Sequence, residues 1–251
     1  MRLIRYCVVF ISVTCLVTAT SASGLVHTGQ QHETKNTVSI VISTKSKTVL
    51  NLEVNSYQLK EAGIAGKKAF IVESPGSPRI QEQGSPDLPK IVRSIIIPDN
   101  AEMLAEVISS DHIEVNDIDI APSKGIITRD IDPASVPFVY GKMYQENKFF
   151  PENLCELGKP YIMRDFRGQT VVFNAFQFNP VTKVLRIYTK VAVKISEVPG
   201  KKSSENVFIR HRSLNRIDKE FSHIYANHFI NFTNLYKYTQ VDEDGGINYL
   251  S

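Results

Sequence analysis

Apolar and polar side chains alternate along much of this chain. Leu50, Leu52 and Val54 alternate with polar neighbours, which is the two-residue period of a strand that buries one face. Similar short apolar runs recur, and turn-forming residues separate them. These runs predict strands over residues 38–42, 50–54, 69–72, 91–97, 105–108 and 113–120. Many short strands, with a turn signal about every ten residues, favour an antiparallel β-sandwich.

The strongest hairpin signal lies around a polar turn at residues 179–183. We expect residues 170–178 to form one strand and residues 184–195 to form the strand that returns. On the returning strand the apolar side chains share one face: Leu185, Ile187, Val191, Val193 and Ile195. Polar side chains occupy most positions between them, which predicts a sheet with one face in water.

The C-terminal part follows a different period. Beyond a linker-like break at residues 199–204, apolar side chains recur about every 3.6 residues from 213 to 229 and predict one helix. Ser213 is the expected N-cap, although Arg216 stands where a capping box would place Glu or Gln. The predicted fold is therefore mainly β: an antiparallel β-sandwich with one C-terminal helix.

The N-terminus has the three parts of a secretory signal peptide. Arg2 and Arg5 form a positive region, residues 6–17 are mostly apolar, and small residues follow at 18–24. The predicted signal peptide is residues 1–23, cleaved after Ala22 or Ser23, and residues 24–36 are predicted to be flexible. A membrane anchor or a buried strand is the alternative, but the apolar run is short for a bilayer about 30 Å thick. The sequence thus predicts export, with no membrane span after signal removal.

Composition excludes one large class of partners. The chain has 251 residues, of which 42% are hydrophobic and 22% are charged, as in ordinary globular proteins. Its formal net charge is only +3, and Arg2 and Arg5 belong to the signal peptide. Nucleic-acid binding depends on clustered Lys and Arg, so we predict no nucleic-acid partner.

The sequence offers poor material for catalysis. Cys155 is the one cysteine outside the signal peptide, and Glu152 and Glu156 beside it disfavour a thiolate. His223 and His228 are five residues apart, a spacing that does not place them on one helix face. We predict no catalytic residue, no metal site and no cofactor. A hydrolase that uses Cys155 or a carboxylate pair is the least favoured alternative.

Three groups of segments resemble the propeptide of the gingipain family of cysteine endopeptidases. The first is GSPDLP at 84–89 followed by a strand ending at Pro98, and the second is PSKG at 122–125 with RDIDP at 129–133. The third and longest includes PYIMRDFRGQT at 160–170 and FQFNPVTK at 176–183. Their order and spacing over about 100 residues make the resemblance specific.

The resemblance implies a domain layout and a partner. In that family a signal peptide precedes a β-sandwich pro-domain, and a caspase-like catalytic domain follows. Here the pro-domain would span residues 37–232, with 233–251 as a linker and the start of a catalytic domain whose His and Cys have no counterpart. Lys237 and Tyr238 match the family's processing step. The implied partner is the cognate caspase-like cysteine peptidase catalytic domain.

The resemblance also implies a role: the domain assists folding of its enzyme and blocks the active site with a basic side chain. Lys124 and Arg129 are the candidates for this side chain, and Arg164 and Arg167 compete with them. Solvated turn charges are the alternative for the first pair, and a structural ion pair is the alternative for the second. A second hypothesis is a free-standing exported β-sandwich that binds carbohydrate or another surface ligand. The absence of Trp, a favoured sugar-stacking residue, counts against it.

Overall fold

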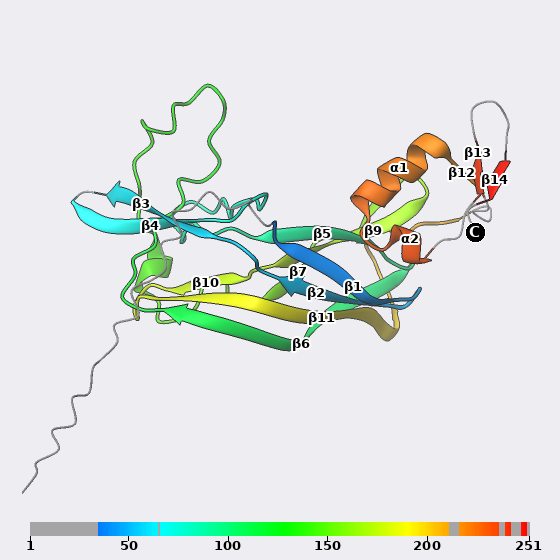
Figure 1. The fold of residues 1–251 in the computed structure, drawn as a ribbon, viewed down its shortest axis with the longest axis horizontal. Coiled ribbons are helices and arrows are strands. Elements are labelled where there is room, and N and C mark those ends of the chain that lie inside the picture. The colour runs from blue at the N-terminus through cyan, green and yellow to red at the C-terminus, as the bar shows by residue number, and fades with distance from the viewer. Residues whose placement is uncertain (1–34, 65, 211–215, 236–238, 242–246, 250–251) are drawn as a thin grey trace, which may run out of the picture.

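The computed structural model describes residues 35–64, 66–210, 216–235, 239–241 and 247–249, and it has an elongated shape (Figure 1). Its larger sheet has the order β1-β2-β11-β10, and β6 pairs with β11 as well. All its pairings are antiparallel. The strands are β1 (Thr37–Ser43), β2 (Lys47–Glu53), β6 (Ala101–Val115), β10 (Phe176–Asn179) and β11 (Val184–Lys202).

A second antiparallel sheet has the order β5-β9-β7, with β8 also paired to β9. Its strands are β5 (Ile91–Ile96), β7 (Cys155–Leu157), β8 (Tyr161–Met163) and β9 (Phe166–Phe173). The main core lies between the two sheets. Leu50, Leu52 and Val193 of the first sheet share this core with Ile95 and Phe173 of the second. The predicted antiparallel β-sandwich is therefore confirmed.

Two smaller sheets and two helices lie at the ends of the sandwich (Figure 1). The hairpin of β3 (Gln58–Ile64) and β4 (Lys67–Glu73) lies at one end, with η1 (Lys142–Gln145), a 3-10 helix, nearby. At the other end are β12 (Arg216–Asp218), α1 (Lys219–His228), α2 (Phe232–Leu235), β13 (Thr239–Val241) and β14 (Ile247–Tyr249). No helix in the described ranges is long and apolar enough to cross a membrane.

The predicted strand over residues 170–178 was wrong, because the chain changes sheets within it. Phe173 ends β9 and pairs with Ile91 in the second sheet, whereas Phe176 begins β10 and pairs with Ile187 in the first. Asn174 makes the crossing, with its side-chain amide donating to the carbonyl of Asn153 at 2.8 Å. Both strands are buried on most positions, so alternation gave no sign of the crossing.

Two predicted boundaries on the long strands were also wrong. The separate strands predicted at 105–108 and 113–120 are one strand, β6, that ends at Val115. Among the described strands β6 pairs only with β11. Its middle residues are exposed on both faces, so the strand can continue through polar residues there. The predicted break at 199–204 is largely strand, since β11 continues to Lys202 and pairs there with Ala101.

The helix prediction was right in place but wrong at its start. The expected cap, Ser213, lies outside the described residues, and residues 216–218 form β12, which pairs in parallel with β13. Asp218 precedes the first turn of α1, and Phe229 follows its last turn. The four-residue helix α2 was not predicted. Phe166, Tyr225, Phe229 and Phe232 pack together beneath these helices, which fixes them to the second sheet.

Candidate functional site

Residues 123–141 form a long projection at the β3–β4 end of the molecule, which we call the arm (Figure 1). It carries both predicted cations, Lys124 and Arg129. Apart from the turns described below, the arm has no strand or helix of its own. Its shape must therefore come from contacts at its neck, where its two ends meet, and between its two limbs, the stretches before and after the turn at 128–131.

Gly84 holds both ends of the arm. Its N–H donates to the carbonyl of Ser123 at 3.0 Å, and its own carbonyl accepts from the N–H of Gly141 at 2.9 Å. Gly84 has φ +80°, in the left-handed region that favours glycine. A Cβ on Gly141 would lie 2.9 Å from the Gly84 oxygen. Two glycines are thus needed for this close approach, and they give the arm a closed neck.

The neck continues as pairing between two of the segments that carry the family resemblance. Ser123 donates its N–H to the carbonyl of Ser85 at 2.7 Å, and Asp87 donates to that of Ala121 at 2.9 Å. The side chain of Tyr144 donates to the carbonyl of Ile120 at 2.7 Å. Segments 84–89 and 122–125 therefore act together, as the base from which the arm projects.

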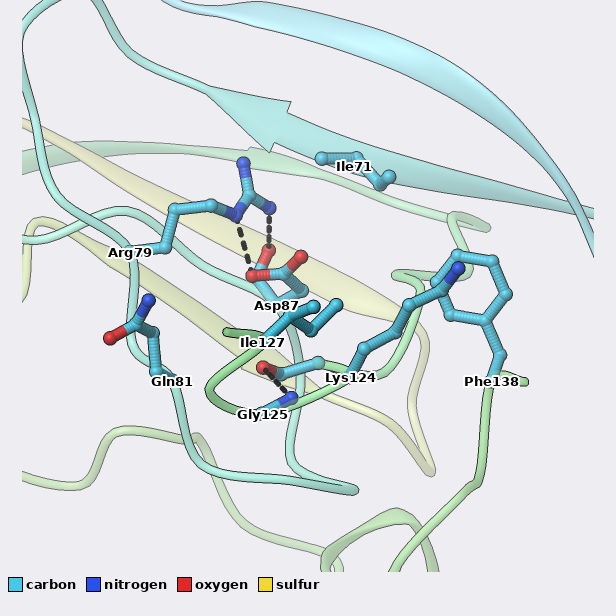
Figure 2. A pocket seen from close by; sticks show the side chains of 9 residues that line it. Ile71, Arg79, Gln81, Asp87, Lys124, Gly125, Ile127 and Phe138 are labelled. Carbon is cyan, nitrogen blue, oxygen red and sulfur yellow. Dashed lines mark hydrogen bonds and ion pairs between the residues drawn. The ribbon is translucent and has the colours of Figure 1, made fainter. Parts of the chain in front are cut away.

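Lys124 braces the arm internally. Its ammonium donates to the carbonyl of Pro133 at 2.7 Å and lies 4.3 Å from the centroid of the Phe138 ring. Pro133 and Phe138 belong to the returning limb, so one cation joins the two limbs (Figure 2). Lys124 is thus already engaged and does not extend freely from the arm.

A pocket of about 300 Å³ lies between the arm and β4. Ile71, Ile127 and Phe138 give it apolar walls (Figure 2). On its polar side the guanidinium of Arg79 donates from Nε to the carboxylate of Asp87 at 2.7 Å. Ile127 and Phe138 of the arm therefore face the body of the protein.

Arg129 lies in the turn between Lys124 and Pro133, which joins the outgoing and returning limbs and which we call the tip of the arm. The N–H of Ile131 donates to the carbonyl of Thr128 at 3.1 Å, which closes a β-turn with Arg129 and Asp130 at its centre. Hydrogen bonds from the Thr128 hydroxyl and from its own N–H lower the pKa of Asp130, so its carboxylate stays charged in this turn. Arg129 is exposed, and within the described part of the chain it forms no ion pair or ring contact.

The competing pair, Arg164 and Arg167, is engaged elsewhere. Arg167 is fully buried and donates to the carbonyls of Pro98, Ala101, Glu205 and Asn206. Burial lowers the pKa of its guanidinium, and the nearby Asp99 carboxylate opposes that shift. Arg164 pairs with Asp218 at 3.0 Å and covers the ring of Phe221. An ion pair thus fits Arg164, whereas Arg167 binds carbonyl oxygens.

The surroundings of Cys155 do not suit a nucleophile. Burial, and then the charge of Glu156, raise the pKa of the thiol to about 12. A thiolate is the reactive form, so Cys155 is held in the inert state near neutral pH. Among the described residues, no group of three His, Cys, Asp or Glu side chains could hold a metal ion.

Several predicted positions lie outside the described residues: the signal cleavage candidates Ala22 and Ser23 and the processing candidates Lys237 and Tyr238. The predicted flexible segment 24–36 is described only at its end, where Asn36 is buried and its amide donates to the hydroxyl of Ser74. The sequence did not reveal the neck glycines as a functional pair, although Gly84 lies in a segment that carries the resemblance.

Comparison with known proteins identifies the family. Residues 29–239 match the family model Propeptide_C25. The chain is 52% identical to Gingipain R1 of Porphyromonas gingivalis over 118 residues, which is 47% of this chain and 12% of that protein. It is 35% identical over 206 residues to Gingipain R2 of the same species, or 82% of this chain and 27% of that protein.

A solved structure agrees with these matches. The complex of P. gingivalis RgpB pro- and mature domains includes a chain with a TM-score of 0.71 and 35% identity. The alignment covers 78% of this chain and 97% of that one. The resemblance inferred from the sequence segments is confirmed, and the present chain spans only a small part of the curated relatives that it matches. The chain belongs to the Propeptide_C25 family.

Proposed function

We propose that this chain is the pro-domain of an exported, gingipain-like cysteine endopeptidase precursor. It helps its enzyme to fold, blocks the active site, and is removed by proteolysis. The observation that carries the proposal is Arg129, a charged side chain at the centre of the turn that forms the tip of an anchored arm. Membership of a propeptide family favours this role over a free-standing binding module.

The chemistry of arginine suits the blocking role. A guanidinium presents a planar set of donors that can bind a carboxylate through two parallel hydrogen bonds. A peptidase pocket that takes basic residues would bind Arg129 in this way. The closed neck and the Lys124 brace hold the arm before binding, so less conformational entropy is lost on docking.

Export and removal complete the proposal. Residues 1–23 would direct the precursor out of the cell and leave it by cleavage after Ala22 or Ser23. Cleavage between Lys237 and Tyr238 would later separate the pro-domain from the enzyme. Expression of the precursor, followed by N-terminal sequencing of the exported fragments, tests both steps. Fragments that begin elsewhere would contradict these two assignments and leave the blocking role to its own test.

The blocking role is tested by adding the chain to the mature domain of Gingipain R2, a relative, and measuring hydrolysis of a small peptide that ends in arginine. We expect inhibition by the unaltered chain and loss of at least about 30-fold in affinity with Arg129→Ala, since truncating one partner of a buried charge pair costs about 2–5 kcal/mol. Lys45→Ala is the control, because Lys45 is an exposed lysine in the turn between β1 and β2.

The outcomes separate cleanly. Loss of inhibition with Arg129→Ala but not with Lys45→Ala supports the proposal. Equal inhibition by Arg129→Ala and the unaltered chain removes Arg129 from the blocking role. Absence of inhibition by the unaltered chain contradicts the proposed function, provided that far-ultraviolet circular dichroism shows a folded β protein.

A further inference from the structure

The arm sorts its apolar side chains into two sets. Ile127 and Phe138 line the pocket and face the body of the protein (Figure 2). Ile126, next in sequence to Ile127, is 77% exposed, and Ile131 on the other side of the tip is 43% exposed. Ile126 is the most exposed of the large apolar side chains in the described part of the chain.

This exposure is built into the shape of the arm. Gly84 closes the neck, Lys124 joins the limbs, and the turn at 128–131 fixes the tip. A second turn follows directly, in which the N–H of Ser135 donates to the carbonyl of Asp132 at 3.0 Å. A backbone held at so many points leaves Ile126 little freedom to turn inward. Its exposure is therefore a property of the folded arm.

We propose that Ile126 and Ile131 form an apolar docking surface on both sides of Arg129. The occupant is the catalytic domain whose pocket takes the arginine, so this inference rests on the proposed function. Ile126 lies three residues before Arg129 and Ile131 two residues after it. A partner that encloses the guanidinium must come against both side chains, and their burial then adds affinity in proportion to the apolar area removed from water.

A similar solved structure favours the catalytic domain over a second copy of this chain as the occupant. That structure is the complex of P. gingivalis RgpB pro- and mature domains, in which a propeptide meets a catalytic domain. A pocket with a carboxylate would bind Arg129, and an apolar rim around that pocket would cover Ile126 and Ile131. Binding energy in such interfaces concentrates in a few central side chains, and the two isoleucines flank the predicted centre.

The test compares isoleucines of matched exposure on the whole chain. Ile126→Ser is paired with Ile209→Ser, because Ile209 is 70% exposed, and Ile131→Ser is paired with Ile224→Ser, because Ile224 is 44% exposed. Inhibition of the mature domain of Gingipain R2 is the readout. We expect each arm variant to bind about tenfold more weakly, mainly through faster dissociation, and each control to stay within about twofold.

Each outcome decides the matter. Weaker inhibition by the two arm variants alone supports the inference. Equal inhibition by all four variants, with Arg129→Ala still impaired, overturns the inference and leaves the proposed function intact. If the unaltered chain does not inhibit, both are overturned. A dimer in solution that Ile126→Ser dissociates would show that the occupant is a second copy and would also overturn the inference.

Discussion

The two ends of the sandwich are built by different means. At the helical end, Phe166, Tyr225, Phe229 and Phe232 form a cluster of buried rings, and Arg167 is buried against four carbonyl oxygens. At the arm end the buried cluster of the described residues is small, with Ile64, Ala69 and Ala121 buried and Phe138 partly buried against them, and backbone hydrogen bonds to Gly84 close the neck. Buried side chains thus dominate at one end, whereas backbone hydrogen bonds dominate at the other and the Lys124 and Tyr144 side chains support them.

The difference has a functional consequence. A region held by its own backbone can leave its side chains free for a partner, as Arg129 and Ile126 are. At the helical end a polar side chain also helps to hold the elements together. Asn231 is fully buried, accepts from the N–H of Ile96 at 2.8 Å and donates to the carbonyl of Ile96 at 3.0 Å. It therefore binds the backbone of β5 at an edge where no strand of the described residues pairs with it.

The largest effect is expected at the helical end. Phe166→Ala removes the ring that contacts Tyr225, Phe229 and Phe232, so we expect a loss of about 3–5 kcal/mol in the free energy of unfolding. Urea unfolding followed by circular dichroism measures it. The molecules that remain folded should still inhibit, because the arm lies at the opposite end (Figure 1).

Phe166→Leu provides a milder version if the alanine variant does not fold, with an expected loss of about 1–1.5 kcal/mol. If either variant weakens inhibition per folded molecule, the helical end contributes to inhibition and the two ends do not act independently. The comparison between the ends is also broken if Phe166→Ala costs less than about 1 kcal/mol, since the ring cluster would then contribute little.

A smaller effect on stability, with a larger effect on inhibition, is expected at the neck. Gly141→Ala places a Cβ at 2.9 Å from the Gly84 oxygen, so the hydrogen bond between the two glycines must lengthen or shift. We expect a loss of about 1–2 kcal/mol in the free energy of unfolding and inhibition about fivefold weaker, because the arm is less well ordered before binding.

Gly63→Ala is the matched control, because a Cβ there would meet nothing within 4 Å and β3 belongs to the same end. It should change the free energy of unfolding by no more than about 0.5 kcal/mol and leave inhibition unchanged. If Gly141→Ala behaved like the control, the neck would not determine how the arm is held.

The sequence predicted the sandwich where one sheet face meets water. In β2, Leu50 and Leu52 are buried and Asn51 between them is exposed, so hydropathy and structure share one period. The same reasoning failed where that period is lost. Phe173 and Phe176 lie in different sheets within one buried run, and the exposed edge strand β6 carries polar residues on both faces.

The site was predictable only in part. Lys124 and Arg129 could be picked out as basic residues of a turn-rich segment that resembles a family, but their different roles depend on Pro133 and Phe138, which lie on the other limb. The neck was not predictable, because it joins Gly84 and Gly141 through backbone atoms alone. Hydropathy and side-chain motifs carry no signal for such a contact.

The smallest effect is expected for Lys124→Met, which keeps a long unbranched side chain and removes the charge that lies 4.3 Å from the centroid of the Phe138 ring. Loss of the bond to Pro133 and of the cation–ring contact should lower the free energy of unfolding by only about 0.5–1 kcal/mol. Inhibition of the mature domain of Gingipain R2 should weaken by less than about threefold, against at least about 30-fold for Arg129→Ala. Lys148→Met is the control, because Lys148 is an exposed lysine outside the arm that pairs with its near neighbour Glu146. Should Lys124→Met abolish inhibition while Arg129→Ala retains it, the two cations would exchange roles: Lys124 would leave Pro133 to enter the peptidase, and the arm would need another brace.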